Sequence, residues 1–132
     1  LGDEELKKQF AEMDLKISHN IQNIALDNGA LNNERENDKI DKKRVWWVEA
    51  ESVVGFINAY QHSGEKKFLE SARSVWEYIK AEMIDKREGS EWYSEVSYDH
   101  KPHDWKEIVG PWKCPYHNGR MCMEVINRGV DF

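Results

Sequence analysis

The residues best suited to chemistry lie near the C-terminal end of the sequence, in the eleven-residue stretch 110–120. Aromatic side chains there offer flat faces on which a sugar ring can stack, and polar side chains offer hydrogen-bond partners for hydroxyl groups. The histidine can also act as an acid or base, and at the predicted start of a helix the dipole favours its neutral, base-competent form. These residues are Trp112, Tyr116, His117, Asn118 and Arg120.

The residue types alone leave two other interpretations of this stretch open. His117 could serve only as a cap of the last helix, with the tryptophan packed in the core, because both residue types are often structural. Cys114, His117 and Cys122 also show the spacing C-x2-H-x4-C, which could hold a metal ion. A structural zinc site normally has four ligands, and no convincing fourth is close in sequence, so we expect no metal here.

Charge and composition exclude several classes of protein. The chain has 132 residues, 19 of them basic and 25 acidic, whereas nucleic-acid binders usually show a basic face. No apolar run is long enough to span a bilayer and no signal segment opens the chain, so we expect no membrane partner. Two cysteines are too few for a disulfide framework, so reduced thiols and a cytoplasmic location are expected. The six tryptophans argue against disorder over most of the length.

Apolar periodicity predicts a mainly helical chain. Apolar side chains recur at steps of three and four, the spacing of one helical face, in the four segments 3–27, 45–62, 65–84 and 117–128. The short turn after residue 62 would join the second and third helices into a helical hairpin. Residues 32–43 are polar and charge-rich and are predicted to be a long loop, and a short strand or extended loop is predicted near 90–97. We expect residues 1–132 to form a single domain.

Four segments form an ordered set of motifs. Residues 112–120 read W-K-C-P-Y-H-N-G-R, residues 46–51 read W-W-V-E-A-E, residues 27–34 read D-N-G-A-L-N-N-E, and residues 91–93 read E-W-Y. In this order and spacing they resemble motifs of the cellobiose and mannobiose 2-epimerases, within the N-acylglucosamine 2-epimerase superfamily. The nonapeptide is the most specific of the four, and the resemblance covers nearly the whole chain.

The resemblance implies an all-α fold. Members of that family form an (α/α)6 barrel, so the antiparallel helix pairs of this chain would make up the C-terminal part of one. Four predicted helices are too few to close a barrel, and we therefore expect a partial barrel domain with exposed apolar helix faces. Such faces drive association. The expected polypeptide partner is either a missing N-terminal part or another copy of the chain.

The resemblance also implies a reaction, the inversion of C2 in the reducing-end glucose or mannose of a β-1,4-linked disaccharide such as cellobiose or mannobiose. After ring opening a base removes the C2 proton, and a second group returns it to the opposite face of a cis-enediolate. Two histidines suit this chemistry, and no cofactor or metal is required. The resemblance implies that His117 is a catalytic residue. It implies that the substrate-binding residues are Trp47, Trp112 and Trp46. The supporting residues that it implies are Glu51, Asn118 and Arg120.

Two departures from the family pattern stand out. The second catalytic histidine belongs to a G-H-D-I-E-type motif, and residues 18–22 read S-H-N-I-Q. Matching them to that motif would delete a whole helix before Asp27, so we predict that His19 is an ordinary helix residue and that one catalytic histidine is missing. Glu49 stands where the pattern usually has Gln, and we expect it to add a charge near the sugar end of its helix.

Three functions follow from these observations. The chain is part of a disaccharide 2-epimerase and inactive alone, or it is a non-catalytic carbohydrate-binding module derived from that family. In the third hypothesis it is a helical interaction module whose tryptophans only build the core. The length of the nonapeptide match indicates descent from that family, so the third hypothesis concerns the present use of the chain rather than its origin.

Overall fold

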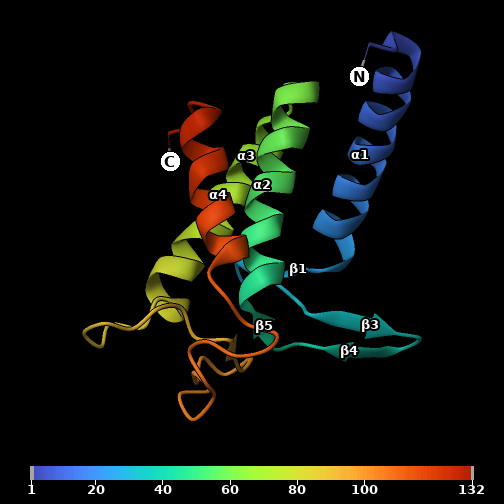
Figure 1. Cartoon of the computed structure of the whole chain (residues 1–132). Helices are drawn as coiled ribbons and strands as arrows, with labels where there is room; N and C mark the ends of the chain where they lie inside the picture. The colour runs from blue at the N-terminus through green and yellow to red at the C-terminus, as the bar shows by residue number, and fades with distance from the viewer. Residues whose placement is uncertain (1, 132) are drawn as a thin grey trace.

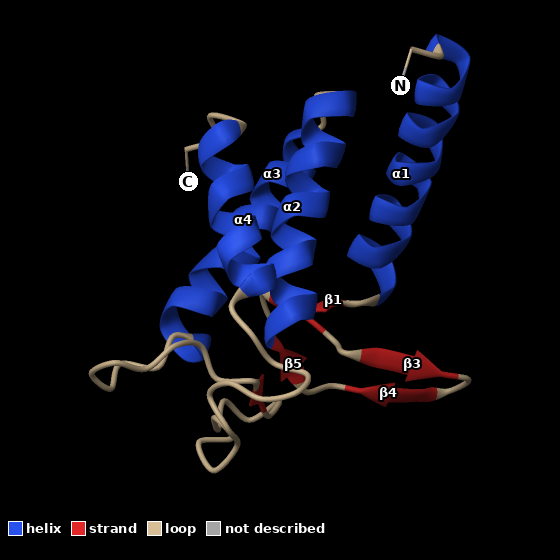
Figure 2. Ribbon diagram, viewed as in Figure 1, coloured by secondary structure: helices blue, strands red, loops and turns tan. Residues whose placement is uncertain are grey.

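The computed structural model describes residues 2–131, which fold mainly into helices (Figures 1 and 2). The helices are α1 (Glu4–Ile24), α2 (Trp46–Ser63), α3 (Lys66–Tyr78), the π-helix η1 (Ile79–Met83) that continues α3, and α4 (Tyr116–Asn127). Helices α2 and α4 run in one direction, and α1 and α3 run against them. The prediction of a helical chain built from antiparallel pairs is therefore confirmed. Both termini lie at one end of the helices, and the long loops gather at the other.

Local interactions explain where the helices begin and end. Asp3 caps α1, because its Oδ1 accepts a hydrogen bond from the backbone N–H of Leu6 at 3.0 Å. Gly64 ends α2 with a left-handed φ of 74°. The range 3–27 predicted for the first helix is too long, since the chain leaves the helix after Ile24 and turns at Asn28, where φ is 52°.

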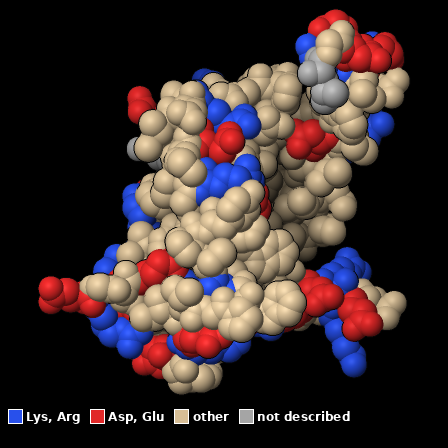
Figure 3. All heavy atoms as spheres, in the orientation of Figure 1, with Lys and Arg blue, Asp and Glu red and all other residues tan. Residues whose placement is uncertain are grey.

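Three short antiparallel strand pairs connect the helices. They are β1 (Leu26–Asp27) with β2 (Ala30–Leu31), β3 (Glu34–Glu36) with β4 (Lys39–Asp41), and β5 (Arg44–Val45) with β6 (Glu95–Val96). The last pair confirms the strand predicted near 90–97. The prediction of a loop over 32–43 was wrong, because β3 and β4 form a hairpin that turns at Asn37 with φ of 53°. The hairpin carries charges of both signs on its surface (Figure 3).

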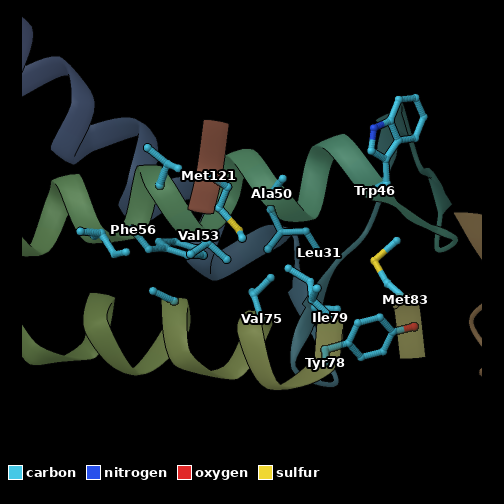
Figure 4. Packing of buried hydrophobic residues seen from close by; sticks show 14 of the residues in the cluster. Leu31, Trp46, Ala50, Val53, Phe56, Val75, Tyr78, Ile79, Met83 and Met121 are labelled. Atoms are coloured by element: carbon cyan, nitrogen blue, oxygen red, sulfur yellow. The ribbon is translucent and has the colours of Figure 1, made fainter. Parts of the chain in front are cut away.

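The core fills the space between α2 and α3 and is closed by α4 and β2. Figure 4 shows Val53 and Phe56 of α2 pointing toward Val75 and Ile79, with Met121 of α4 reaching in from a third side. All five side chains are buried. Because α2 and α4 both pack into this core, their first turns lie close together at the loop-bearing end of the molecule.

Helix α1 lies beside α2 and diverges from it toward the N-terminus (Figure 1). Much of its apolar side is uncovered. Four of its apolar side chains are about half exposed: Phe10, Met13, Ile17 and Ile24. The expected exposed apolar helix face is therefore present. Among residues 2–131, no helix combines the length and apolar character needed to cross a bilayer.

Candidate active site

His117 lies beside a carboxylate that comes from a distant part of the sequence. It is the second residue of α4, and Glu51 lies in the second turn of α2. Nδ1 of His117 and Oε1 of Glu51 are 2.8 Å apart, although 66 residues separate them in the sequence. Arg120, one turn further along α4, donates from Nη2 to the other oxygen of Glu51. The shared core of α2 and α4 brings this cluster together.

The cluster fixes the ionisation of its carboxylate. Partial burial acts to raise the pKa of Glu51, but hydrogen bonds from His117 and Arg120 hold that pKa below its ordinary value. The same contact raises the pKa of Arg120. An ionised Glu51 can only accept hydrogen bonds, so the facing Nδ1 of His117 carries a proton. In a neutral imidazole, Nε2 is then left to accept a proton from a substrate.

Aromatic rings surround the histidine unevenly. The ring of Trp47 lies 6.0 Å from the imidazole, centre to centre, and is 44% exposed. Tyr116 meets the same imidazole edge-on at 5.0 Å. Trp112 is 91% exposed, whereas Trp46 is buried with 8% exposed. The face of Trp47 is thus available beside the histidine, and Trp46 is mainly covered.

Glu91 links the aromatic loop to the helix that carries the histidine. Its two carboxylate oxygens accept hydrogen bonds from Nζ of Lys113 and from Nδ2 of Asn118. Lys113 is buried, and it also donates to the backbone oxygen of Ile108 at 3.0 Å. Glu91 therefore fixes the residue after Trp112 and the first turn of α4 at once. The sequence interpretation gave Glu91 no role, and only its place in the E-W-Y motif drew attention to it.

Glu49 lies in the first turn of α2, at the loop-bearing end as expected, but its side chain faces the core. It is fully buried, and both carboxylate oxygens accept from the backbone N–H of Leu31, at 3.1 and 3.0 Å. Two residues along a helix turn the side chain by about 200°, so Glu49 and Glu51 point to opposite sides of α2. Burial raises the pKa of Glu49 to about 8, against that hydrogen bond and the charge of Arg44. A raised pKa favours the neutral acid, and the buried side chain presents no charge to the candidate site.

A hollow of about 350 Å3 lies between α1 and α2, and Figure 3 shows its mainly uncharged walls. We call it the α1–α2 hollow. Trp47 and Glu51 line it from α2, and Ile17 and Ile21 line it from α1. Its apolar wall on the α1 side suits the side chains of another helix.

Two other sequence interpretations can be compared with the structure. His19 lies within α1, with Nε2 at 3.3 Å from Glu65 and its ring 4.8 Å from that of Phe68. It is thus an ordinary helix residue, as predicted. Cys114 and Cys122 are free and exposed, and within residues 2–131 no three His, Cys, Asp or Glu side chains are placed to hold a metal ion.

Comparison with known proteins places the chain in a family and supports its fold. The family model described as N-acylglucosamine 2-epimerase matches residues 11–119. A cellobiose 2-epimerase of Ruminococcus albus is 81% identical over 99% of this chain and 34% of its own length. A cellobiose 2-epimerase of Dictyoglomus turgidum is 45% identical over 97% of this chain and 33% of its own length. The crystal structure of a sugar epimerase from a ruminal bacterium has a TM-score of 0.96 at 80% identity, covering 99% of this chain and 34% of that one.

Fold and site together define a helical protein whose antiparallel pairs match part of an (α/α)6 barrel, with an imidazole–carboxylate pair at its loop-bearing end. This chain belongs to the N-acylglucosamine 2-epimerase family. It spans about a third of the length of the curated relatives that it matches.

Proposed function

We propose that the chain contributes one half of the acid/base machinery of a sugar epimerase, which inverts C2 of the reducing-end glucose or mannose of a β-1,4-linked disaccharide. The main support is the 2.8 Å contact between Nδ1 of His117 and Oε1 of Glu51, beside the exposed face of Trp47. The names of the relatives support the substrate class, because the similar proteins of Ruminococcus and Dictyoglomus are called cellobiose 2-epimerases.

The proposed mechanism gives each group of the cluster a separate task. Glu51 accepts the Nδ1–H bond and so orients the imidazole of His117, and Arg120 holds the second oxygen of that carboxylate in place. After the sugar ring opens, Nε2 of His117 takes the C2 proton, and the electrons of the C2–H bond form the enediolate. Glu51 stabilises the imidazolium that results. Trp47 provides a flat surface for the sugar beside the histidine.

Return of the proton to the opposite face of C2 needs a second acid, and His117 reaches only one face. This chain matches one of the two histidines that the family motifs provide. We therefore propose that the 132-residue chain is inactive alone and works together with further polypeptide. Asn118 supports the site through Glu91 rather than through the substrate.

The test is C2-proton exchange of cellobiose in D2O, followed by proton NMR with the chain alone and with a grafted enzyme. In the graft, residues 2–131 of this chain replace the matching residues of the R. albus relative. We expect no exchange with the chain alone and full exchange and epimerisation with the graft. His117→Ala should lower the exchange rate of the graft at least about 100-fold, since general-base catalysis contributes about that much or more.

Trp76→Phe is a matched control for the graft, because Trp76 lies on α3, outside the His117 cluster. It should leave the exchange rate unchanged. A graft that folds and epimerises normally without His117 would contradict the assignment of that residue. Exchange catalysed by the 132-residue chain alone would contradict the claim that it needs further polypeptide.

The apolar face of α1 supports the proposal of a polypeptide partner. The half-exposed side chains of Phe10, Met13 and Ile17 border the α1–α2 hollow or a neighbouring one. Without the rest of a longer chain, we expect a second copy to cover this face. Sedimentation should show self-association that Met13→Ser with Ile17→Ser abolishes and that Ile40→Ser, on the exposed hairpin, does not. A monomer at all concentrations would contradict this expectation.

A non-catalytic carbohydrate-binding module is the second candidate. The exposure of Trp112 and Trp47 favours it over a purely structural module, because a structural tryptophan is normally covered. Binding of cellobiose by the chain, combined with a graft that never exchanges C2, would select this alternative.

A further inference from the structure

A second hollow lies at the loop-bearing end of the molecule, between the start of α2 and the long loop over 97–113. We call it the Trp105 hollow. Its volume is about 690 Å3, and Trp105 and Trp112 line it together with Trp46. Neither the proposed mechanism nor any motif of the sequence uses Trp105.

Two tryptophan rings at this hollow are open to solvent. Trp105 is 73% exposed and Trp112 is 91% exposed. A large ring that faces water contributes little to folding stability, because it buries no apolar surface. An exposed aromatic face can, however, stack on the apolar face of a sugar ring. The exposure therefore favours a role in binding a ring-shaped ligand.

The position of Trp105 is fixed by its neighbours. Its ring stacks on that of His103, with 4.5 Å between centres and 29° between planes. His103 is in turn held through Nδ1 at 3.1 Å from Oε2 of Glu95, in strand β6. The platform is thus anchored to a strand that pairs with the segment preceding α2. A ring held in this way loses little freedom when a ligand stacks on it.

The charges that line the hollow are mostly compensated. Nζ of Lys106 lies 2.8 Å from Oε1 of Glu95, and the buried Lys113 is bound to Glu91. Such a wall offers little net attraction to an ion. It does offer hydrogen-bonding groups at its rim, where Glu107 adds an exposed carboxylate. Aromatic faces combined with polar rims suit a neutral polyhydroxylated ligand.

Glu91 links the hollow to the helix that carries His117. Lys113 lines the hollow, and Glu91 accepts hydrogen bonds both from Lys113 and from Asn118, the residue after His117. We propose that the Trp105 hollow binds one further pyranose unit of a β-linked oligosaccharide whose reducing end lies at His117. This inference rests on the proposed function, and it makes Trp105 a determinant of preference for saccharides longer than two units.

Titration of the 15N-labelled 132-residue chain with cellobiose and with cellotriose tests the proposal. The six tryptophan indole signals can be assigned by single Trp→Phe replacements. Cellotriose should shift the signal of Trp105, and cellobiose should shift that of Trp47 but not that of Trp105. Cellotriose should also bind about tenfold more tightly, the effect expected for one aromatic stacking contact.

Trp105→Ala should reduce the affinity for cellotriose to that for cellobiose and change the affinity for cellobiose less than about twofold. Because Trp105 is exposed, this replacement should leave the fold intact. Equal affinities for the two sugars, or a cellotriose preference that survives Trp105→Ala, would overturn the proposal. If Trp105 responds as expected but the graft never exchanges the C2 proton, the binding site stands and the proposed catalysis fails.

Discussion

Two glutamates of α2 only two residues apart have opposite environments. Glu49 is fully buried, accepts from a single backbone N–H, and has a pKa raised by burial to about 8. Glu51 is partly exposed and accepts from His117 and Arg120, which hold its pKa low in spite of its partial burial. One helix thus presents a neutral carboxyl group to the core and a carboxylate to the candidate site.

The difference shows that the partners of a carboxyl group decide its role more than its place in a motif. Gln is the usual residue at position 49 of the family pattern, and a protonated Glu49 is nearly the same shape and also uncharged. The buried site is therefore compatible with either residue. Gln at position 51 is expected to impair the site, because a carboxylate makes a stronger hydrogen bond to His117 and stabilises its protonated form.

Removing the carboxyl group of Glu49 should have the largest effect on stability. Glu49→Ala leaves the buried N–H of Leu31 without an acceptor and opens a cavity, and we expect it to cost about 4 kcal/mol. Glu49→Gln keeps an acceptor of the same size and should change stability by less than about 1 kcal/mol. Urea unfolding followed by circular dichroism measures both. Equal losses for the two variants would show that the charge of Glu49, and not its hydrogen bond, matters.

A third glutamate sharpens the comparison, because Glu91 compensates a charge as Glu51 does but lies close to the core. Glu91→Ala leaves the buried ammonium group of Lys113 without its carboxylate and should cost about 3 kcal/mol. Lys113→Met, which removes the buried charge itself, should restore part of that stability in the double variant. Urea unfolding of the two single variants and the double variant gives the coupling free energy between Glu91 and Lys113. If the stability losses of the single variants simply add in the double variant, the two residues do not form a stabilising pair.

Stability should also depend on pH through Glu49. Since its pKa is raised in the folded state, the folded protein holds this proton more tightly than the unfolded chain does. The resulting stabilisation is complete below about pH 4.5 and is lost as the pH rises through about 8. Between pH 6 and pH 9 the loss should be about 2.5 kcal/mol.

Glu49→Gln isolates this effect, because every other titrating group is shared with the parent chain. Urea unfolding at pH 6, 7, 8 and 9 measures the free energy of unfolding of both proteins. As the pH rises, the parent should lose stability relative to the Glu49→Gln variant. A constant difference over this range would mean that Glu49 is already ionised at pH 6.

Local periodicity predicted much of the fold. The four helices were found because their apolar faces repeat along the sequence. The same periodicity could have predicted that Glu49 is buried. Glu49 lies four residues from both Val45 and Val53, which belong to the apolar stripe of α2. The β3–β4 hairpin was missed because Ile40 is the only apolar residue in its two strands, so no repeated alternation marks them.

The candidate site was predicted only as a set of residue types. His117 and Trp47 came from motifs, but the contact from His117 to Glu51 spans 66 residues, and the one from Asn118 to Glu91 spans 27. Such contacts depend on how α2, α4 and the loop pack together. No local pattern records that packing, which is why the linking role of Glu91 was found only in the structure.

The smallest effect on stability is expected at Glu51, although its effect on chemistry should be large. The cluster is partly exposed, so Glu51→Gln should cost less than about 1 kcal/mol at pH 7. Its contribution is present above the ordinary pKa of a glutamate and is lost as the pH falls through the lowered value, opposite in sign to that of Glu49. In the grafted enzyme the same change should slow C2 exchange at least about tenfold, since the imidazole loses its orienting carboxylate. A variant that loses several kcal/mol of stability but keeps its exchange rate would mean that Glu51 is a structural residue like Glu49.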